Sequence, residues 1–553
     1  MTAAAGPSGV ESDRRLRIVP LGGLGEFGLN ALVVEWGEDA ILVDAGAMVP
    51  ASELAGVDSI APDFSYLRRP GLKLHGVFLT HGHDDHVAAL AFALRAQAAP
   101  VWGTRLTLGL ARHRLRERGA SADLRPLSAG ESVEAGPFRV HGIRVAHSVS
   151  DSLALAIQTP AGTLLHSGDF KLDAAEGLAT DVEALAEWGE RGVLALLSDS
   201  TNVERRGRGG SEDDVIPAFE EIFARAAGRV VVGCFASSFP RIQRVADAAR
   251  RAGRRVCFLG RRMIENVGVA SELGELRIAP EWRISPAEAA GYPPGRVTFL
   301  ASGSQGERGS ALAALSEGEH RGVATSAGDT VVLSARVIPG CERMVSRMIS
   351  AFYRRGCEVA HPGTAPVHVS GHAHRDDLAE LIRLTRPRHL VPLHGEFRML
   401  AQHARLAVEA GVPAERVGLA ENGQVLGVGT GGIARVGSAP AGRVLLDPSG
   451  TAPFGPRTVR ERRALAGRGL VVPVVVVDRE TRALRVPPRF VTRGVVDEAG
   501  ALLCEAREIV VGMLREPITT GVALEERLRA GLRLMFRRQA HRRPAIEPVV
   551  VEI

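Results

Sequence analysis

The chain has 553 residues, of which 45% are hydrophobic and 24% are charged, and its formal net charge is +5. This balance excludes a disordered, collagen-like or disulfide-scaffold protein, and it supplies apolar side chains for several cores. The five cysteines are scattered without a CxxC pair, and no run of 18 apolar residues occurs. We therefore expect a soluble cytoplasmic protein without a membrane partner.

Short strands with tight turns dominate the first 170 residues, after a small and polar stretch (1–13) that we expect to be a disordered tail. Strands before and between helices predict a layered α/β fold. The strands are predicted at 16–21, 31–36, 40–44, 74–80, 138–147, 154–159 and 163–168, and the helices at 87–98 and 107–118.

From about residue 204 to 364 helix and strand patterns alternate, which predicts a parallel-sheet domain inserted into the first one. The Gly-rich stretch 427–432 and the Pro/Gly stretch 447–456 are predicted to be loops that lead to a linker. A final α/β module follows, with strands at 470–477, 490–496 and 548–553 and helices at 503–514 and 524–538.

The positive charge is concentrated in this final module. Residues 451–553 hold 19 arginines against 12 acidic residues, a net charge of +7, whereas the first 450 residues carry −2. A basic module of this kind can face a polyanion such as a nucleic acid, and a solvated surface is the alternative of equal weight.

A GxGxxG pattern at Gly23, Gly25 and Gly28 directly follows the first predicted strand. A dinucleotide site requires a helix to begin at such a loop. A strand pattern follows instead, so we expect a tight turn between two strands.

Three histidines and two aspartates fall within six residues, at Thr80-His-Gly-His-Asp-Asp-His86, directly after a predicted strand. Residues i and i+2 project the same way at a strand end, so His81 and His83 can bind one metal ion. Asp85 and His86 lie later and can reach a second ion. Imidazole with carboxylate suits Zn²⁺, and Mn²⁺ is the harder alternative. A solvated polar loop is the structural alternative, which this density of ligands disfavours.

This cluster is the HxHxDH signature of the metallo-β-lactamase superfamily, and the chain resembles that superfamily at four further positions in order. Asp44 closes a strand where the family has an aspartate that orients the histidine loop, and His147, Asp169 and His394 match later ligands. The resemblance implies two Zn²⁺ ions per subunit, or Mn²⁺ as the alternative. It implies that His81, His83 and His147 bind the first ion, that Asp85, His86 and His394 bind the second, and that Asp169 bridges them.

The insertion between Asp169 and His394 resembles the β-CASP domain of nucleases, and the whole chain from about residue 16 resembles the bacterial ribonuclease J family. The motifs are Leu197-Ser-Asp-Ser-Thr201, Ser370-Gly-His372, Gly303-Ser-Gln-Gly-Glu307 and Ile338-Pro-Gly340. The implied fold class is α/β, a metallo-β-lactamase αββα sandwich (14–203 and 365–442) with an inserted β-CASP α/β domain (204–364). A linker (443–460) and a small C-terminal α/β domain (461–553) complete it.

The resemblance implies a metal-dependent ribonuclease with 5′-to-3′ exonuclease and some endonuclease activity, which acts in RNA maturation and mRNA decay. It implies that Asp199 and His372 transfer protons, with Asp85 as the metal-binding member of the catalytic set. It also implies RNA as substrate, a homodimer or homotetramer, and partners in RNA decay. The expected substrate contacts are Ser237, Ser238, Phe239, Ser304, His368, Val369, Ser370, Gly371 and His372.

Two other function classes are alternatives. A small-molecule hydrolase of the same superfamily, such as a thioesterase or lactonase, is disfavoured by the insertion and the basic module. A non-catalytic RNA-binding scaffold is disfavoured by the complete set of ligands. DNA as substrate stays open, and so does the effect of Ser238, Phe239, Cys341 and His374, where the chain departs from the family pattern.

Overall fold

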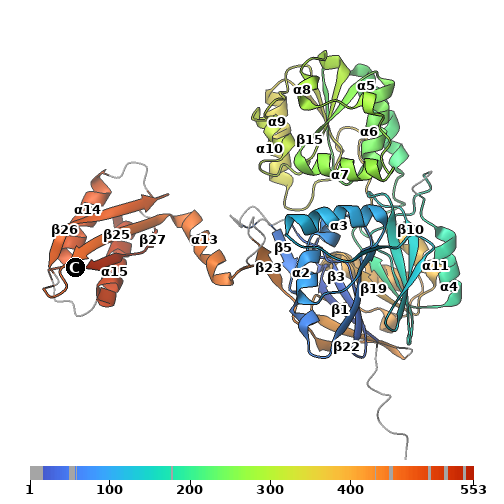
Figure 1. Cartoon of the computed structure of the whole chain (residues 1–553), viewed down its shortest axis with the longest axis horizontal. Coiled ribbons are helices and arrows are strands. Elements are labelled where there is room, and N and C mark those ends of the chain that lie inside the picture. The colour runs from blue at the N-terminus through green and yellow to red at the C-terminus, as the bar shows by residue number, and fades with distance from the viewer. Residues whose placement is uncertain are drawn as a thin grey trace, which may run out of the picture. The chain divides into compact units, whose positions relative to one another are not determined.

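The computed structural model describes residues 16–48, 57, 59–175, 179–429, 431–446, 453–481, 483–495, 500–515, 521–539 and 543–553 (Figure 1). The predicted disordered tail, 1–13, lies outside these residues, as does much of the predicted linker loop 447–456. The chain forms two compact units, Met1–Val49 with Ile60–Val444 and Pro50–Ser59 with Leu445–Ile553, which are described separately.

The first unit contains a sandwich of two sheets with helices on the outside. In sheet order, the first sheet consists of β22 (Gly432–Ser438), β21 (Gln424–Gly429), β1 (Leu16–Gly22), β3 (Ala31–Trp36), β4 (Asp39–Val43), β6 (Lys73–Phe78), β7 (Val101–Gly103) and β8 (Leu124–Pro126). The second consists of β19 (His389–Leu393), β13 (Val193–Asp199), β12 (Gly162–His166), β11 (Ser152–Thr159), β10 (Phe138–Val145) and β9 (Ser132–Ala135). The outer helices are α1 (Asp84–Val87), α2 (Leu90–Ala96), α3 (Arg105–Glu117), α4 (Val182–Arg191), α11 (Arg375–Thr385) and α12 (Phe397–Glu409).

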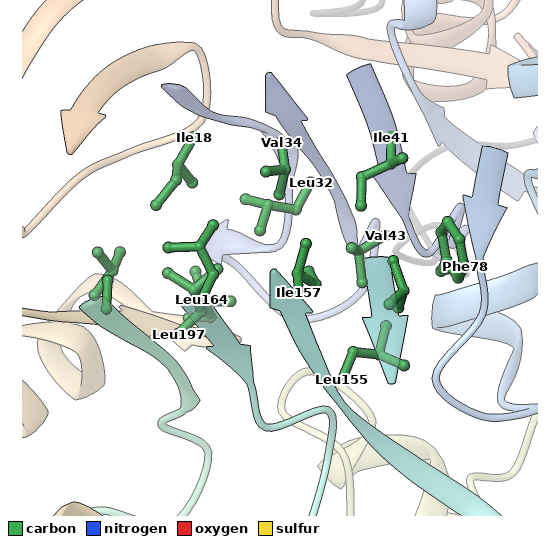
Figure 2. Packing of buried hydrophobic residues seen from close by; sticks show 14 of the residues in the cluster. Ile18, Leu32, Val34, Ile41, Val43, Phe78, Leu155, Ile157, Leu164 and Leu197 are labelled. Carbon is green, nitrogen blue, oxygen red and sulfur yellow. The ribbon is translucent and has the colours of Figure 1, made fainter. Parts of the chain in front are cut away.

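Apolar side chains of the two sheets interdigitate to form the core of the sandwich. Figure 2 shows Val34 and Ile41 of the first sheet facing Ile157 and Leu164 of the second, within one continuous cluster. The other face of the second sheet packs against α4 and α11, where Trp188 is buried. Burial on both faces explains why several of these strands have continuous apolar runs rather than alternating ones.

The inserted domain has a five-stranded parallel sheet with helices on both faces. Its strands, in sheet order, are β15 (Arg255–Leu259), β16 (Val297–Ala301), β14 (Val230–Gly233), β17 (Thr330–Leu333) and β18 (Glu358–Ala360). Helices α5 (Ile216–Arg225), α6 (Phe239–Arg251) and α7 (Arg261–Glu272) share one core cluster, and α9 (Ala311–Glu317) and α10 (Glu342–Arg354) share the other (Figure 1).

The second unit packs two long helices on one face of a small sheet. Strand β25 (Leu470–Val477) pairs antiparallel with β26 (Leu484–Arg493) and parallel with β27 (Ala545–Ile546) and β28 (Val549–Glu552). Helices α14 (Gly500–Met513) and α15 (Gly521–Gln539) share a core with the buried valines of β25. The predicted fold class, an αββα sandwich with an inserted and a C-terminal α/β domain, is thereby confirmed.

One local prediction was wrong. The Gly-rich stretch 427–432 was expected to be a loop, but residues 427–429 and 432 lie in β21 and β22, which pair as a hairpin, and Val428 lies opposite Leu16 of β1. A sheet neighbour more than 400 residues away outweighs the weak strand propensity of glycine. Helix α13 (Pro456–Arg468) begins within the predicted linker 443–460.

The GxGxxG segment is a turn between β1 and β3, as predicted. Gly23, Gly25 and Gly28 all have positive φ angles, between +79° and +88°, in the left-handed region where a Cβ atom is disfavoured. No helix follows the glycines, so the segment is not a dinucleotide-binding loop.

Candidate metal centre

The histidine loop that follows β6 is held by Asp44, at the end of β4. Asp44 accepts hydrogen bonds from the amide and the hydroxyl of Thr80, at 2.8 and 2.9 Å, and from Nδ1 of His86 at 2.8 Å. Asp44 has a φ angle of +61°, an uncommon conformation for a residue with a side chain. Because His86 donates from Nδ1, its Nε2 is left as the donor atom for a metal.

Three imidazoles converge in the first half of the cluster. Nδ1 of His83 lies 3.0 Å from Nε2 of His81 and 3.1 Å from Nε2 of His147. His147 donates from Nδ1 to the carbonyl of Gly371 at 2.8 Å, so its Nε2 is also free for a metal. Burial lowers the pKa of all three imidazoles, and that of His81 and His147 falls well below the usual value. Neutral imidazole is the form that binds metal ions.

One carboxylate oxygen lies at the centre of the cluster. Oδ2 of Asp169 is 3.3 Å from Nε2 of His86, 3.7 Å from Nε2 of His394 and 3.8 Å from Nε2 of His81. Burial alone would raise the pKa of Asp169, but His394 and His86 outweigh it and hold this pKa well below its usual range. Asp169 is therefore ionised and within reach of both halves of the cluster.

The second half of the cluster contains Asp85, His86 and His394. Oδ2 of Asp85 lies 3.5 Å from Nε2 of His394 and 3.7 Å from Nε2 of His86. Burial lowers the pKa of His394, but the carboxylates of Asp169, Asp199 and Asp85 raise it to about 10. The surrounding carboxylates thus favour a cation at this position.

The donor set fits a centre for two metal ions. The described part of the chain contains three overlapping groups of possible metal ligands, and in each group the ligand atoms lie within 4.8 Å of one another. Asp169 belongs to all three groups. Mixed imidazole and carboxylate donors match the ligand preferences of Zn²⁺. The groups are His81, His83, His147 and Asp169; Asp85, His86, Asp169 and His394; and Asp169, Asp199, His372 and His394.

Asp199 and His372 lie beside this cluster. Nδ1 of His372 is 2.8 Å from Oδ2 of Asp199, and the other oxygen of Asp199 accepts from the hydroxyl and the amide of Thr201. Burial raises the pKa of Asp199, but His372 and His394 hold it below its usual range. Asp199 is therefore an ionised acceptor that fixes the orientation of the His372 ring.

The loop 370–372 is built around Gly371. A Cβ atom at this position would lie 2.8 Å from Nδ1 of His147, so only glycine allows the loop to approach this closely. The Ser370 hydroxyl accepts hydrogen bonds from Asn202 at 2.8 Å and from the His372 amide at 3.2 Å. His368, Val369 and Ser370 are partly exposed.

The predicted contact through Phe239 was wrong. Its side chain has no exposed surface and belongs to the apolar core of the inserted domain, on the first turn of α6. Ser238 and Ser304 are also nearly buried, at 6% and 4% exposure, whereas Ser237 is partly exposed. Of the four residues, Ser237 is therefore the one whose side chain is best placed for solvent or substrate.

Two residues near Ser370 were not among the residues predicted from the sequence. Asn202 donates to Ser370 and to the carbonyl of His372, and Arg336 donates to Asn202 at 2.6 Å. Burial and the nearby Arg205 and Arg398 lower the pKa of Arg336, so positive charge accumulates here. Asn202 directly follows the motif that ends at Thr201, which is a usable signal, whereas Arg336 lies 134 residues away.

The fold and the cluster are those of a metallo-hydrolase of the metallo-β-lactamase type with an inserted β-CASP domain. Residues 24–233 match the family model of the "Metallo-beta-lactamase superfamily", and residues 363–417 match a "Zn-dependent metallo-hydrolase RNA specificity domain". Residues 227–352 match the "Ribonuclease J, beta-CASP domain", and residues 457–553 match the "Ribonuclease J C-terminal domain".

Similar proteins extend over nearly the whole chain. A ribonuclease J of Mycobacterium tuberculosis is 37% identical and covers 99% of both chains. A ribonuclease J2 of Bacillus subtilis is 33% identical, over 98% of this chain and all of the relative. The chain belongs to the ribonuclease J family, which confirms the predicted family and enzyme class.

A solved structure agrees with the fold. A protein of unknown function from Enterococcus faecalis V583 superposes with a TM-score of 0.52 at 15% identity, over 75% of this chain and the whole of that one. Within the described residues, no helix combines the length and apolar character needed to cross a membrane.

Proposed function

We propose that this protein hydrolyses RNA phosphodiesters with two Zn²⁺ ions, as a 5′-to-3′ exonuclease that also cuts internally, in RNA maturation and mRNA decay. The observation that carries the proposal is the pair of donor groups that share Asp169. His81, His83 and His147 would hold one ion and Asp85, His86 and His394 the other. Two bound ions of this kind activate a water nucleophile and neutralise charge on a phosphodiester.

The protein's own groups orient the substrate and move a proton. Because Asp199 holds Nδ1 of His372, the remaining nitrogen, Nε2, is the atom from which His372 gives a proton to the leaving oxygen. A positioned acid of this kind contributes about 10²–10⁴-fold to a rate. Asp199 stays ionised throughout and keeps the ring in one orientation.

The test is hydrolysis of RNA labelled at the 5′ or the 3′ end, with single-stranded DNA of the same sequence in parallel. Mononucleotide release from the 5′ end, loss of activity in EDTA, and recovery with Zn²⁺ support the proposal. If activity returns with Mn²⁺ and not with Zn²⁺, the metal in the proposal is Mn²⁺ instead of Zn²⁺. Equal hydrolysis of DNA, or activity that survives complete metal removal, would contradict it.

Recognition of the 5′ end is assigned to the loop 370–372 and its neighbours. Ser370, His368 and Ser237 offer hydroxyl and imidazole groups, and Arg336 adds a guanidinium that contacts Asn202 beside Ser370. A few donors of this kind would bind a 5′-monophosphate better than a triphosphate. We expect faster decay of monophosphorylated RNA, and Ser370→Ala should reduce that preference while internal cleavage persists.

The control is Ser350→Ala, a serine on α10 whose hydroxyl bonds only to its own helix. This variant should keep the wild-type preference for monophosphorylated RNA. Equal decay of the two RNAs by the wild-type protein would contradict recognition of a 5′-monophosphate by this loop and would favour an endonuclease.

Self-association is assigned to the open face of the C-terminal sheet. Alternate residues of β25 are buried against α14 and α15, whereas Val474 and Val476 face the other side beside the exposed Val549, Val551 and Val486. An exposed apolar patch of this kind marks an interaction site, here for a homodimer or homotetramer. Val549→Lys with Val551→Lys should lower the mass measured by light scattering, whereas Val522→Lys, an exposed valine on α15, should not.

The remaining parts of the proposal are the domain boundaries (14–203, 204–364, 365–442, 443–460 and 461–553), action in the cytoplasm and contacts with other RNA-decay proteins. Limited proteolysis tests the boundaries, and cell fractionation with cross-linking tests the location and the contacts.

A further inference from the structure

Arg241 carries a charged group into the interior of the inserted domain. It lies on α6 and is only 1% exposed. Burial of a charge is costly unless it is paired and fully hydrogen-bonded. A charged side chain at such a position therefore needs an explanation beyond the packing of α6.

The first partner of Arg241 lies on the segment by which the chain enters the inserted domain. Nε and Nη2 donate to the two carboxylate oxygens of Glu212 at 3.0 and 3.1 Å, and Glu212 itself has no exposed surface. Such a two-pronged pair fixes both distance and angle. It ties α6 to this entry segment, which we call the outgoing crossover.

The other partners are Ser334, which follows β17 in the inserted domain, and two carbonyls of the segment 367–369, by which the chain returns to the sandwich. Nη1 donates to the Ser334 hydroxyl at 2.6 Å and to the carbonyl of Val367 at 3.1 Å, and Nη2 donates to the carbonyl of Val369 at 3.3 Å. Ser334 in turn donates to the carbonyl of Val367 at 2.7 Å. One guanidinium thus holds both crossovers at once.

The return segment leads directly into the loop 370–372. The carbonyl of Gly371 accepts from His147, and His372 contacts Asp199. The close approach of Gly371 to His147 leaves this loop no space on that side. A displacement of residues 367–369 would therefore move His372 relative to Asp199.

We propose that Arg241 is a positioning residue for RNA hydrolysis, which aligns His372 with Asp199 by fixing the return segment 367–369. This inference rests on the proposed role of His372 as proton donor. Arg241 itself touches neither the metal cluster nor the site of proton transfer. Its contribution passes through the backbone of the return segment.

The matched control is Arg254, an equally buried arginine of the inserted domain at 3% exposure. Its guanidinium donates to the carbonyls of Gly228, Ala226 and Val297, all within the same domain. If a buried arginine only stabilises the fold, its replacement should affect stability and kcat alike at both positions. If Arg241 positions His372, kcat should fall in the Arg241 variant and not in the Arg254 variant.

The first experiment compares Arg241→Lys with Arg254→Lys in the full-length protein, by steady-state hydrolysis of RNA. Lysine keeps the charge beside Glu212 but lacks the fork, so we expect kcat to fall about tenfold with KM within about twofold. Arg254→Lys should leave both constants within about twofold, although both variants lower the melting temperature. Ser334→Ala should act in the same direction as Arg241→Lys, about threefold, and carries the test if Arg241→Lys does not fold.

The second experiment repeats these substitutions in a His372→Ala background. If Arg241 acts through His372, Arg241→Lys and Ser334→Ala should change the residual rate by less than about twofold, because the group they align is gone. Metal content, measured for every variant, should equal that of the wild type.

Three results would overturn the inference: effects that multiply in the double variant, an equal loss of kcat in Arg254→Lys, or loss of metal in Arg241→Lys. Failure of the underlying function gives a different result. Wild-type kcat in His372→Ala alone would refute the proton-donor role, whatever Arg241→Lys does.

Discussion

The metal cluster and the loop 370–372 are neighbours that are held in place differently. In the cluster, ligands at the ends of strands are oriented by adjacent groups of the sandwich, as His86 is by Asp44 and His394 by Thr201. The loop is held by Asn202 of the sandwich, which donates to Ser370 and in turn accepts from Arg336 of the inserted domain. The comparison indicates that the metal cluster is oriented by groups of the sandwich, whereas the loop is also tied, through Asn202, to the inserted domain.

The largest effect should follow removal of a metal ligand. His83→Ala should lower the RNA hydrolysis rate by at least about 10³-fold while the protein stays folded, because one ion loses a donor. Asp85→Ala should act likewise, and metal content measured by mass spectrometry should fall with it. His141→Ala, on β10 and paired with Gln158, is the control and should keep full activity. Wild-type turnover by either ligand variant after metal depletion would refute the metal assignment.

The second effect separates the loop from the cluster. His372→Ala should lower kcat by about 10²–10⁴-fold, since the proton donor is lost. The metal content should equal that of the wild type, because the first two donor groups stay complete. Loss of metal in this variant would show that the loop also contributes to metal binding.

A smaller effect is expected at Arg336. Replacement by methionine removes a charged donor beside Ser370, so kcat/KM on 5′-monophosphorylated RNA should fall about tenfold. Arg354→Met, which removes an exposed arginine on α10, is the matched control. A similar loss in both variants would mean that the effect is one of general surface charge.

The smallest effect on activity is expected at the contact between the sandwich and the outgoing crossover. Lys171 donates to Asp173 at 2.8 Å and to the carbonyl of Gly210 at 3.0 Å, and Asp173 accepts from the amide of Glu212. Asp173→Asn breaks this buried pair and should lower the free energy of unfolding by about 3 kcal/mol. The rate at a temperature where the variant is folded should change little.

The pH dependence of this loss has a defined sign. Burial raises the pKa of Asp173, but Lys171 outweighs it, so the folded protein has the lower pKa. The stabilisation is therefore present above the unfolded value of about 3.9 and is lost as the pH falls through the folded pKa. Denaturant unfolding should show a wild-type advantage at pH 6–7 that shrinks below about pH 4. An advantage that grows on acidification would contradict the assignment.

Much of the cluster could be predicted because it is encoded in short motifs. The HxHxDH loop directly follows a strand, and the later ligands stand at strand ends whose apolar runs are visible in the sequence. The hairpin of β21 and β22 could not be predicted locally, because its partner β1 lies at the other end of the chain. Arg336 and Arg241 give no local signal either, since their partners lie about 30 to 130 residues away.

Phe239 is a different case, because the sequence did contain the relevant signal. Phe239, Ile242, Val245 and Ala249 follow the spacing of a buried helix face, and all four are in the core of the inserted domain. This periodicity is a better guide to the position of Phe239 than the resemblance to a substrate-binding motif. Helical periodicity decides which side chains of a motif reach the surface.

The insertion between Asp169 and His394 also determines when the protein can acquire activity during its own synthesis. The ligands His81 to Asp169 emerge first, but the second donor group is incomplete until His394 has been added. At about 5–20 residues per second, translation of the intervening segment takes on the order of 10 to 50 seconds. Strand β1 pairs early with β3 but gains its second neighbour, β21, only late in synthesis. Under the proposed two-ion mechanism, a nascent chain would lack activity toward the messenger that encodes it until most of its length has been made.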